Sequence, residues 1–351
     1  MRGLLLVAAA SGAAFGSITP TPIGDLGAPV ELSAGGGALV TASHYWSAGG
    51  GAVSTDGFAA TRLSADGSTA VGTLSNAPGR WTPAVGFHPL PAAPGYVLSA
   101  PRGVSADGSV VLVTANDGSG GRAALYSTGE GTLHVTPAIN HPLTSIRPVG
   151  LDLSADGTTI GASGLAASNV SNLAQYRYTQ AGGWAEGSVI GSSAGGNLGP
   201  GTMADSGAAF ATNGRSNFGY DGCVLLSRPG AGDVEIFGQN PMEIGAIAIY
   251  GVSLGGDRVA GFSDCVECAL RTQWVWSAGS GETEAFAFLA GNGADFSGWS
   301  NLSLSAMAPN GVTFAGTGTL AGSRQTWIVT IPAPGAFALL AAAGLAVRRR
   351  R

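Results

Sequence analysis

Three cysteines are the residues with which this chain could most readily carry out redox or metal chemistry. Cys265 and Cys268 form a Cys-x-x-Cys pair, and Cys223 stands alone. A redox pair needs a helix N-terminus to lower the thiolate pKa, but this pair lies between expected strands beside Asp264 and Glu267, whose charges would raise it. A zinc site needs four ligands, and no second Cys or His pair lies nearby. Since the chain ends described below indicate export, we expect a disulfide, Cys265–Cys268 or a link from Cys223 to one of them. Unpaired thiols and a metal or redox role are the alternatives.

Acidic residues and histidines supply the other candidates. Asp66, Asp107 and Asp156 each precede a Gly at equivalent positions of a repeat, where they could bind a cation as a ring or simply close their own turns. We expect the turn role. The loops 116–120 and 292–295 contain one Asp each, whereas calcium needs six to eight oxygen ligands. Surface or turn roles are expected for the histidines, which are His44, His88, His134 and His141. The sequence therefore predicts no catalytic residue, no metal site and no cofactor.

The elements that would hold these residues form an internal repeat. A Leu-Ser-Ala-Asp-Gly-Ser type of turn, followed by an apolar strand, recurs seven times, with its glycines at Gly36, Gly67, Gly108, Gly157, Gly207, Gly256 and Gly311. A second element follows each turn: an apolar or aromatic residue, then Ser or Thr, then a glycine turn, as in YWSAGGG and VWSAGSG. Repeat units of roughly 40 to 50 residues that each form a small antiparallel sheet are typical of propeller blades.

The fold class predicted by this repeat is all-β, a β-propeller of seven blades. Six blades are the alternative, because the first step between turn glycines is only 31 residues. Residues 17–27 precede the first repeat and have no strand partners of their own. We expect them to complete the last blade, since joining the two ends of the ring removes two exposed sheet edges.

The repeats resemble the HAF-type extracellular repeats of exported bacterial proteins. The matching features are the Ser-Ala-Asp-Gly turns, the strands after them, the aromatic-Ser/Thr strands and Ile-Gly-Asp-Leu-Gly at 23–27. The resemblance covers most of residues 18–331. It implies a propeller and assigns no catalytic residue.

Both ends of the chain carry targeting features. Residues 1–16 have the basic start, apolar run and small-residue end of a signal peptide. Residues 332–351 begin with Pro332-Ala333-Pro334, continue with a 13-residue apolar run and end in Arg348, Arg349, Arg350 and Arg351. This three-part layout resembles the PEP-CTERM sorting signal, with Ala in place of the acidic middle residue. The resemblance implies export, membrane retention and an exosortase-like processing protease. We expect a short C-terminal helix over 335–349, although about 20 residues are needed to span a bilayer. The propeller domain is then 17–331.

Charge and composition narrow the function classes. The chain has a formal charge of −5, and without the five arginines of the two end segments the body has 11 basic against 21 acidic residues. Nucleic-acid binding needs a basic footprint, so it is excluded. The leading interpretation is an exported, transiently tethered surface or extracellular-matrix propeller that binds a polysaccharide or surface protein. A polysaccharide-active hydrolase with carboxylates at the channel and a purely structural envelope component are the alternatives. The sequence does not decide whether the chain is an enzyme and favours a non-catalytic role.

Overall fold

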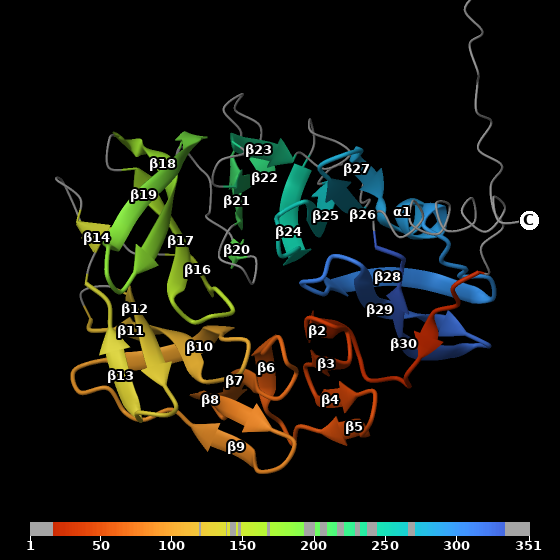
Figure 1. The fold of residues 1–351 in the computed structure, drawn as a ribbon, viewed down its shortest axis with the longest axis horizontal. Helices are drawn as coiled ribbons and strands as arrows, with labels where there is room; N and C mark the ends of the chain where they lie inside the picture. The colour runs from red at the N-terminus through yellow and green to blue at the C-terminus, as the bar shows by residue number, and fades with distance from the viewer. Residues whose placement is uncertain are drawn as a thin grey trace, which may run out of the picture.

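Seven four-stranded antiparallel sheets make up the protein, which is represented by a computed structural model. It describes residues 17–118, 121–137, 139–140, 145–146, 149–166, 169–192, 201–203, 209–215, 221–228, 232–236, 244–265 and 271–333. The sheets are arranged radially around a centre (Figure 1). The fold is therefore the predicted seven-bladed β-propeller.

We number the blades along the chain, and each runs from its inner to its outer strand. The strands of blades 1 to 3 are β2 (Pro29–Leu32), β3 (Ala38–Thr41), β4 (His44–Ser47), β5 (Gly51–Ser54); β6 (Ala59–Leu63), β7 (Ala70–Leu74), β8 (Ala77–Thr82), β9 (Gly86–Pro89); β10 (Val97–Val104), β11 (Val110–Asn116), β12 (Gly121–Ser127), β13 (Thr132–Val135). The strands of blades 4 to 6 are β16 (Val149–Leu153), β17 (Thr159–Ala166), β18 (Asn169–Thr179), β19 (Gly183–Ser192); β20 (Gly201–Met203), β21 (Phe210–Arg215), β22 (Asp221–Arg228), β23 (Gly232–Ile236); β24 (Ile244–Val252), β25 (Arg258–Cys265), β26 (Arg271–Ser277), β27 (Gly281–Glu284). A two-stranded hairpin, β14 (Ile139–Asn140) and β15 (Ser145–Ile146), follows blade 3.

Blade 7 is built from both ends of the described chain. Its strands are β28 (Trp299–Met307), β29 (Thr313–Leu320) and β30 (Ser323–Thr330), and its outer strand is β1 (Thr21–Pro22). Thr21 pairs with Ile328. The side chain of Thr326 adds two bonds, accepting from the N–H of Leu26 at 3.2 Å and donating to the carbonyl of Gly27 at 2.8 Å. The expected closure of the ring by the N-terminal segment is confirmed.

The alternative of six blades is wrong. Blade 1 accommodates its short repeat because each of its four strands, β2 to β5, has only four residues. The described residues contain one helix, α1 (Ala285–Gly291), between blades 6 and 7. None of the described helices is long and apolar enough to span a membrane. The predicted signal peptide, C-terminal helix, Pro334 and the four terminal arginines lie outside the described residues. Pro332 and Ala333 follow β30 in neither strand nor helix.

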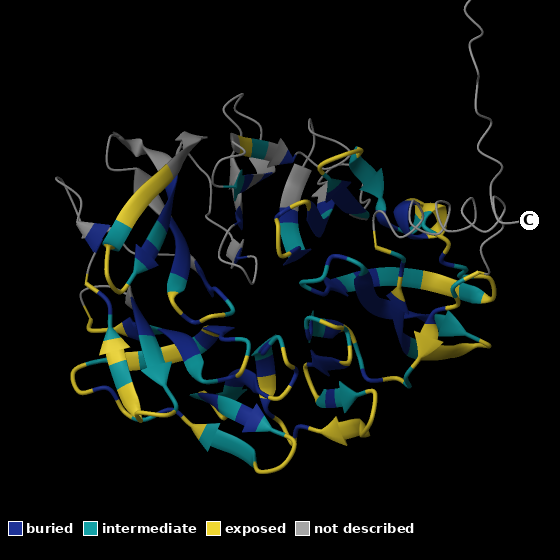
Figure 2. Cartoon of the chain, in the orientation of Figure 1, coloured by how far each residue is buried: buried dark blue, intermediate teal, exposed yellow. Residues whose placement is uncertain are grey.

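The core lies between neighbouring blades. Leu39 of blade 1 packs with Ala315 and Ile328 of blade 7 in one buried cluster, which seals the joint where the ring closes. Figure 2 shows buried residues concentrated on the inner and middle strands and exposed residues on outer strands such as β5. Burial between blades stabilises the ring, and the inner strands around its axis have no neighbouring strand on that side.

Candidate functional site

The aspartates of the repeat turns are used locally. Oδ1 of Asp66 accepts from the N–H of Ser68 at 2.8 Å and from the hydroxyl of Ser64 at 2.7 Å. At the equivalent turn, the hydroxyl and N–H of Ser109 and the hydroxyl of Ser105 lower the pKa of Asp107 to about 2. These contacts satisfy the carboxylates within their own turns, as expected from the sequence.

The turns also join one blade to the next. The N–H of Ala34 donates to the carbonyl of Ala65 at 2.7 Å, the N–H of Ala106 to that of Ala155 at 2.6 Å, and the N–H of Leu254 to that of Pro309 at 2.8 Å. All six residues occupy the third position of their repeat turn. In the described part of the chain, the turns therefore form a belt of hydrogen bonds that joins blades 1 to 2, 3 to 4 and 6 to 7 at one mouth of the channel.

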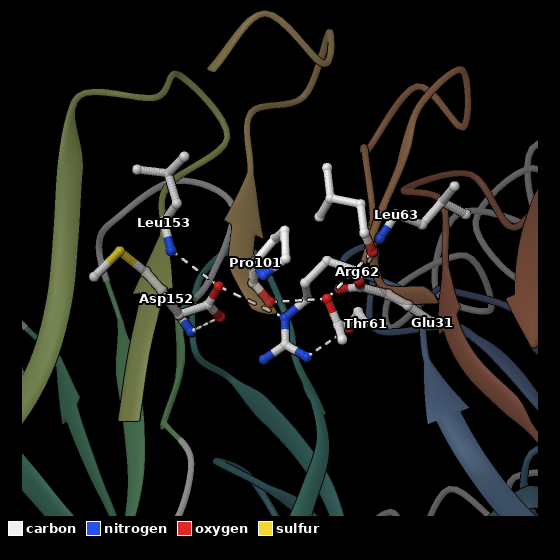
Figure 3. Close-up of polar contacts among 9 residues, drawn as sticks. Glu31, Thr61, Arg62, Leu63, Pro101, Asp152 and Leu153 are labelled. Atoms are coloured by element: carbon white, nitrogen blue, oxygen red, sulfur yellow. Dashed lines mark hydrogen bonds and ion pairs between the residues drawn. The ribbon is translucent and has the colours of Figure 1, made fainter. Parts of the chain in front are cut away.

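A cluster of charged residues lies beside this belt, and Figure 3 shows its polar contacts. Each member lies on an inner strand, two residues before the serine of a repeat turn. The members are Glu31 on β2, Arg62 on β6 and Asp152 on β16. Nε of Arg62 lies 3.8 Å from Oδ1 of Asp152. We call these three residues the channel cluster.

The acids of the channel cluster bind backbone N–H groups of the inner strands. Oε2 of Glu31 accepts from the N–H of Leu63 in blade 2 at 2.7 Å. Oδ2 of Asp152 accepts from the N–H of Met203 in blade 5 at 2.8 Å, and its Oδ1 from the N–H of Leu153 at 2.9 Å. The inner strands have no neighbour on the channel side, so these N–H groups would otherwise lack a strand partner.

Blade 3 lies between Arg62 in blade 2 and Asp152 in blade 4. At the repeat position that Arg62 and Asp152 occupy in their blades, blade 3 has Gly103. A Cβ added at Gly103 would lie 2.7 Å from Cβ of Leu153 and 3.2 Å from Oδ1 of Asp152. A side chain here would displace blade 4 and the carboxylate of Asp152. Blades 2 and 3 are also joined directly, because the hydroxyl of Thr61 donates to the carbonyl of Pro101 at 2.8 Å.

Burial and charge act in opposite directions on the cluster. Burial raises the pKa of Asp152, and this effect outweighs the opposing effects of Arg62 and the two backbone donors. Burial lowers the pKa of Arg62, but the nearby charges of Asp152 and Glu31 raise it by more than burial lowers it. The net effect is a raised pKa. Arg62 therefore stays a cation, and its charge compensates the buried acid.

Two spaces adjoin the cluster. One of about 20 Å³ is bordered by Asp152, Arg62 and Glu31 and by turn residues such as Ala106, and it has room for about one water. A larger cavity of about 140 Å³ lies on the axis and is lined from five blades, including Glu31, Arg62, Tyr250, Ser305 and Met307. Asp152 borders only the small space. Among its described lining residues, the larger cavity thus has one carboxylate, one guanidinium and two hydroxyl-bearing residues.

The other residues singled out from the sequence are scattered. His44, His88 and His134 lie on β4, β9 and β13, away from the inner strands, and His141 is outside the described residues. Oδ1 of Asp295 accepts from the N–H of Ser297 at 2.8 Å. Within the described part of the chain, no three His, Cys, Asp or Glu side chains are grouped as metal ligands would be.

The cysteine prediction is not tested. Cys268 lies outside the described residues, and Cys223 and Cys265 are placed on β22 and β25 without described side chains. A disulfide between Cys265 and Cys268, or from Cys223 to one of them, stays a prediction.

Sequence reasoning missed the channel cluster. The available signal was the residue just before the first apolar residue of each repeat turn, which is Glu in the first repeat, Arg in the second, Gly in the third and Asp in the fourth. Aligning the repeats on their glycines places these residues at one level of the ring.

Comparisons with known proteins agree with the fold. No family model and no curated protein matches the sequence. A solved oligogalacturonate lyase in complex with manganese is 10% identical with a TM-score of 0.53, and the match covers 82% of each chain. A second oligogalacturonate lyase, from Vibrio parahaemolyticus, is 10% identical with a TM-score of 0.52 over 90% of this chain and 91% of that one. TolB from Acinetobacter baumannii is 13% identical with a TM-score of 0.46, and the chain spans 64% of its length. The likenesses to the two oligogalacturonate lyases concern the propeller fold alone.

Proposed function

We propose that this chain is an exported propeller that acts by binding, held at a membrane by its C-terminal segment and then released to the cell surface or matrix by an exosortase-like protease. The basic and apolar patterns of residues 1–16 and 332–351 support export and tethering. The partner is a polysaccharide or a surface protein.

The composition of the described lining of the larger cavity supports the choice of binding over hydrolysis. Acid/base hydrolysis of a glycosidic bond uses two carboxylates that flank that bond. Of the two acids in the channel cluster, Glu31 lines the cavity of about 140 Å³, whereas Asp152 borders only the space of about 20 Å³. Among the described lining residues, a single carboxylate beside a guanidinium supplies hydrogen-bond acceptors and donors for recognition.

Fractionation of the producing cell tests the tethering half of this proposal. The full chain and a chain lacking residues 335–351 are followed in membrane and extracellular fractions. We expect the full chain in the membrane fraction before release, the truncated chain only outside it, and a mature C-terminus near Pro332 by mass spectrometry. An unchanged distribution, or a surface protein that retains Arg351, would contradict the proposal.

A further inference from the structure

We infer that the larger axial cavity binds one neutral sugar unit, either a free monosaccharide or the end of a glycan. This inference deepens the proposed binding function and rests on it. It names the cavity lined by Glu31, Arg62, Tyr250, Ser305 and Met307 as the site and a polyhydroxylated ring as the ligand class.

Charge is the first reason for a neutral ligand. The cavity has one acid, Glu31, and one base, Arg62, among its described lining residues. An anion would meet Glu31, and a cation would meet Arg62, so either would lose hydration next to a like charge. A neutral ligand avoids this cost while still using both groups for charge-assisted hydrogen bonds.

The pattern of donors and acceptors is the second reason. Guanidinium only donates and carboxylate only accepts, whereas each sugar hydroxyl does both and can bond either group. The wall includes the inner strands β2, β24 and β28, which have no neighbouring strand on the channel side. Gly251, on this wall, packs so closely on blade 7 that an added Cβ would lie 2.4 Å from the carbonyl oxygen of Met307.

Size and apolar lining complete the argument. A cavity of about 140 Å³ holds several waters, which is the scale of one sugar ring rather than of an oligosaccharide. Val30, Ile249 and Met307 line the same space and offer apolar surface to the C–H faces of the ring. Binding sites for small molecules commonly combine such apolar walls with a few fixed polar groups.

The channel cluster fixes those polar groups before a ligand arrives. Glu31 is held by the N–H of Leu63 at 2.7 Å, and Arg62 by Asp152 at 3.8 Å and by the carbonyl of Thr61 at 3.0 Å. Groups held in place lose little conformational entropy on binding. Asp152 therefore acts as a positioning residue, although it does not border the cavity.

Isothermal titration calorimetry with the folded protein tests the assignment. The probes are glucose, galactose and N-acetylglucosamine as neutral sugars, with galacturonate and glycine as charged and zwitterionic comparators. We expect at least one neutral sugar to bind with a Kd on the order of 1 mM and to bind more tightly than either comparator. No heat from any neutral sugar at about 50 mM, or tighter binding of galacturonate or glycine, would overturn the inference.

Two variants locate the site. Glu31→Gln keeps an oxygen for the N–H of Leu63 but removes the charge, and it should weaken sugar binding about tenfold. Ser305→Leu should block binding by filling the cavity, and it decides the question alone if the first variant fails to fold. Glu130→Gln, in the hairpin between β12 and β13, is the matched control and should bind as the wild type does. Wild-type affinity in Ser305→Leu would overturn the inference, while the fractionation result would still stand for export and tethering.

Discussion

Nε of Arg62 in blade 2 lies 3.8 Å from Oδ1 of Asp152 in blade 4, and the blade between them contributes a glycine at the equivalent position. The pair links two blades that are not neighbours. Asp152 in turn accepts from the N–H of Met203 in blade 5. One ion pair therefore connects much of one side of the ring.

Removing one member of this pair should lower the free energy of unfolding far more than removing one member of an exposed pair. The side chain of Asp152 is 8% exposed and that of Arg62 26%, so Arg62→Met leaves a buried acid uncompensated and should lower the free energy of unfolding by about 3 kcal/mol. The control is Arg324→Met, because Arg324 and Asp25 form a pair at 3.9 Å with both side chains more than half exposed. We expect it to lose less than about 1 kcal/mol in urea-induced unfolding. Equal losses would show that the Arg62 pair does not stabilise the ring.

Replacing a turn glycine that faces the preceding blade with alanine should destabilise the protein more than replacing a glycine of the same conformation in an open hairpin. Gly108 has φ +72°, and an added Cβ would lie 2.3 Å from Oγ1 of Thr69 in blade 2. Gly86 has φ +82° with nothing within 4 Å. Gly86→Ala should cost about 1–2 kcal/mol for the left-handed conformation alone. Gly108→Ala should cost at least about 1 kcal/mol more, for the clash between blades. Equal unfolding midpoints would contradict the packing described for the turns.

The stability contributed by Asp107 should depend on pH. Its folded pKa, about 2, lies below the ordinary 3.8, so on acidification the unfolded chain takes up the proton first. The contribution is fully present above 3.8 and is lost as the pH falls towards 2. NMR titration of the carboxyl carbon should give the low value. Ser109→Ala, which removes the largest cause, should raise it. A wild-type midpoint near 3.8 would contradict the turn geometry.

The closure of the ring should depend on Thr326. This buried side chain bonds both the N–H of Leu26 and the carbonyl of Gly27. Thr326→Val keeps the shape but removes both bonds and should cost about 2 kcal/mol. Thr319→Val, which loses only a 3.4 Å contact from Asn301, should cost less than about 0.5 kcal/mol. Similar urea midpoints for the two variants would show that the side chain of Thr326 does not hold the N-terminal segment.

The turns and blades could be predicted because their causes are local. A serine, an aspartate and a glycine within four residues satisfy one another, as Ser64, Asp66 and Gly67 do. Repetition of that unit then indicated the propeller, and the unpartnered N-terminal segment indicated how the ring closes.

The channel cluster could not be predicted in the same way because its contacts join repeats far apart in the sequence. Nothing near Arg62 in the chain indicates that Gly103 leaves room for it to approach Asp152. Likewise, the N–H of Leu63 becomes available to Glu31 only because β6 is an inner strand without a neighbour on the channel side. Such relationships follow from the packing of complete blades.

A crystal structure of the protein soaked in its best-binding neutral sugar tests most directly whether the axial cavity is the binding site. We predict density for one sugar ring on the axis, with hydroxyl groups within hydrogen-bond distance of Glu31 and Arg62. Density only on the outer strands or between molecules, with the axial cavity holding water alone, would contradict the account.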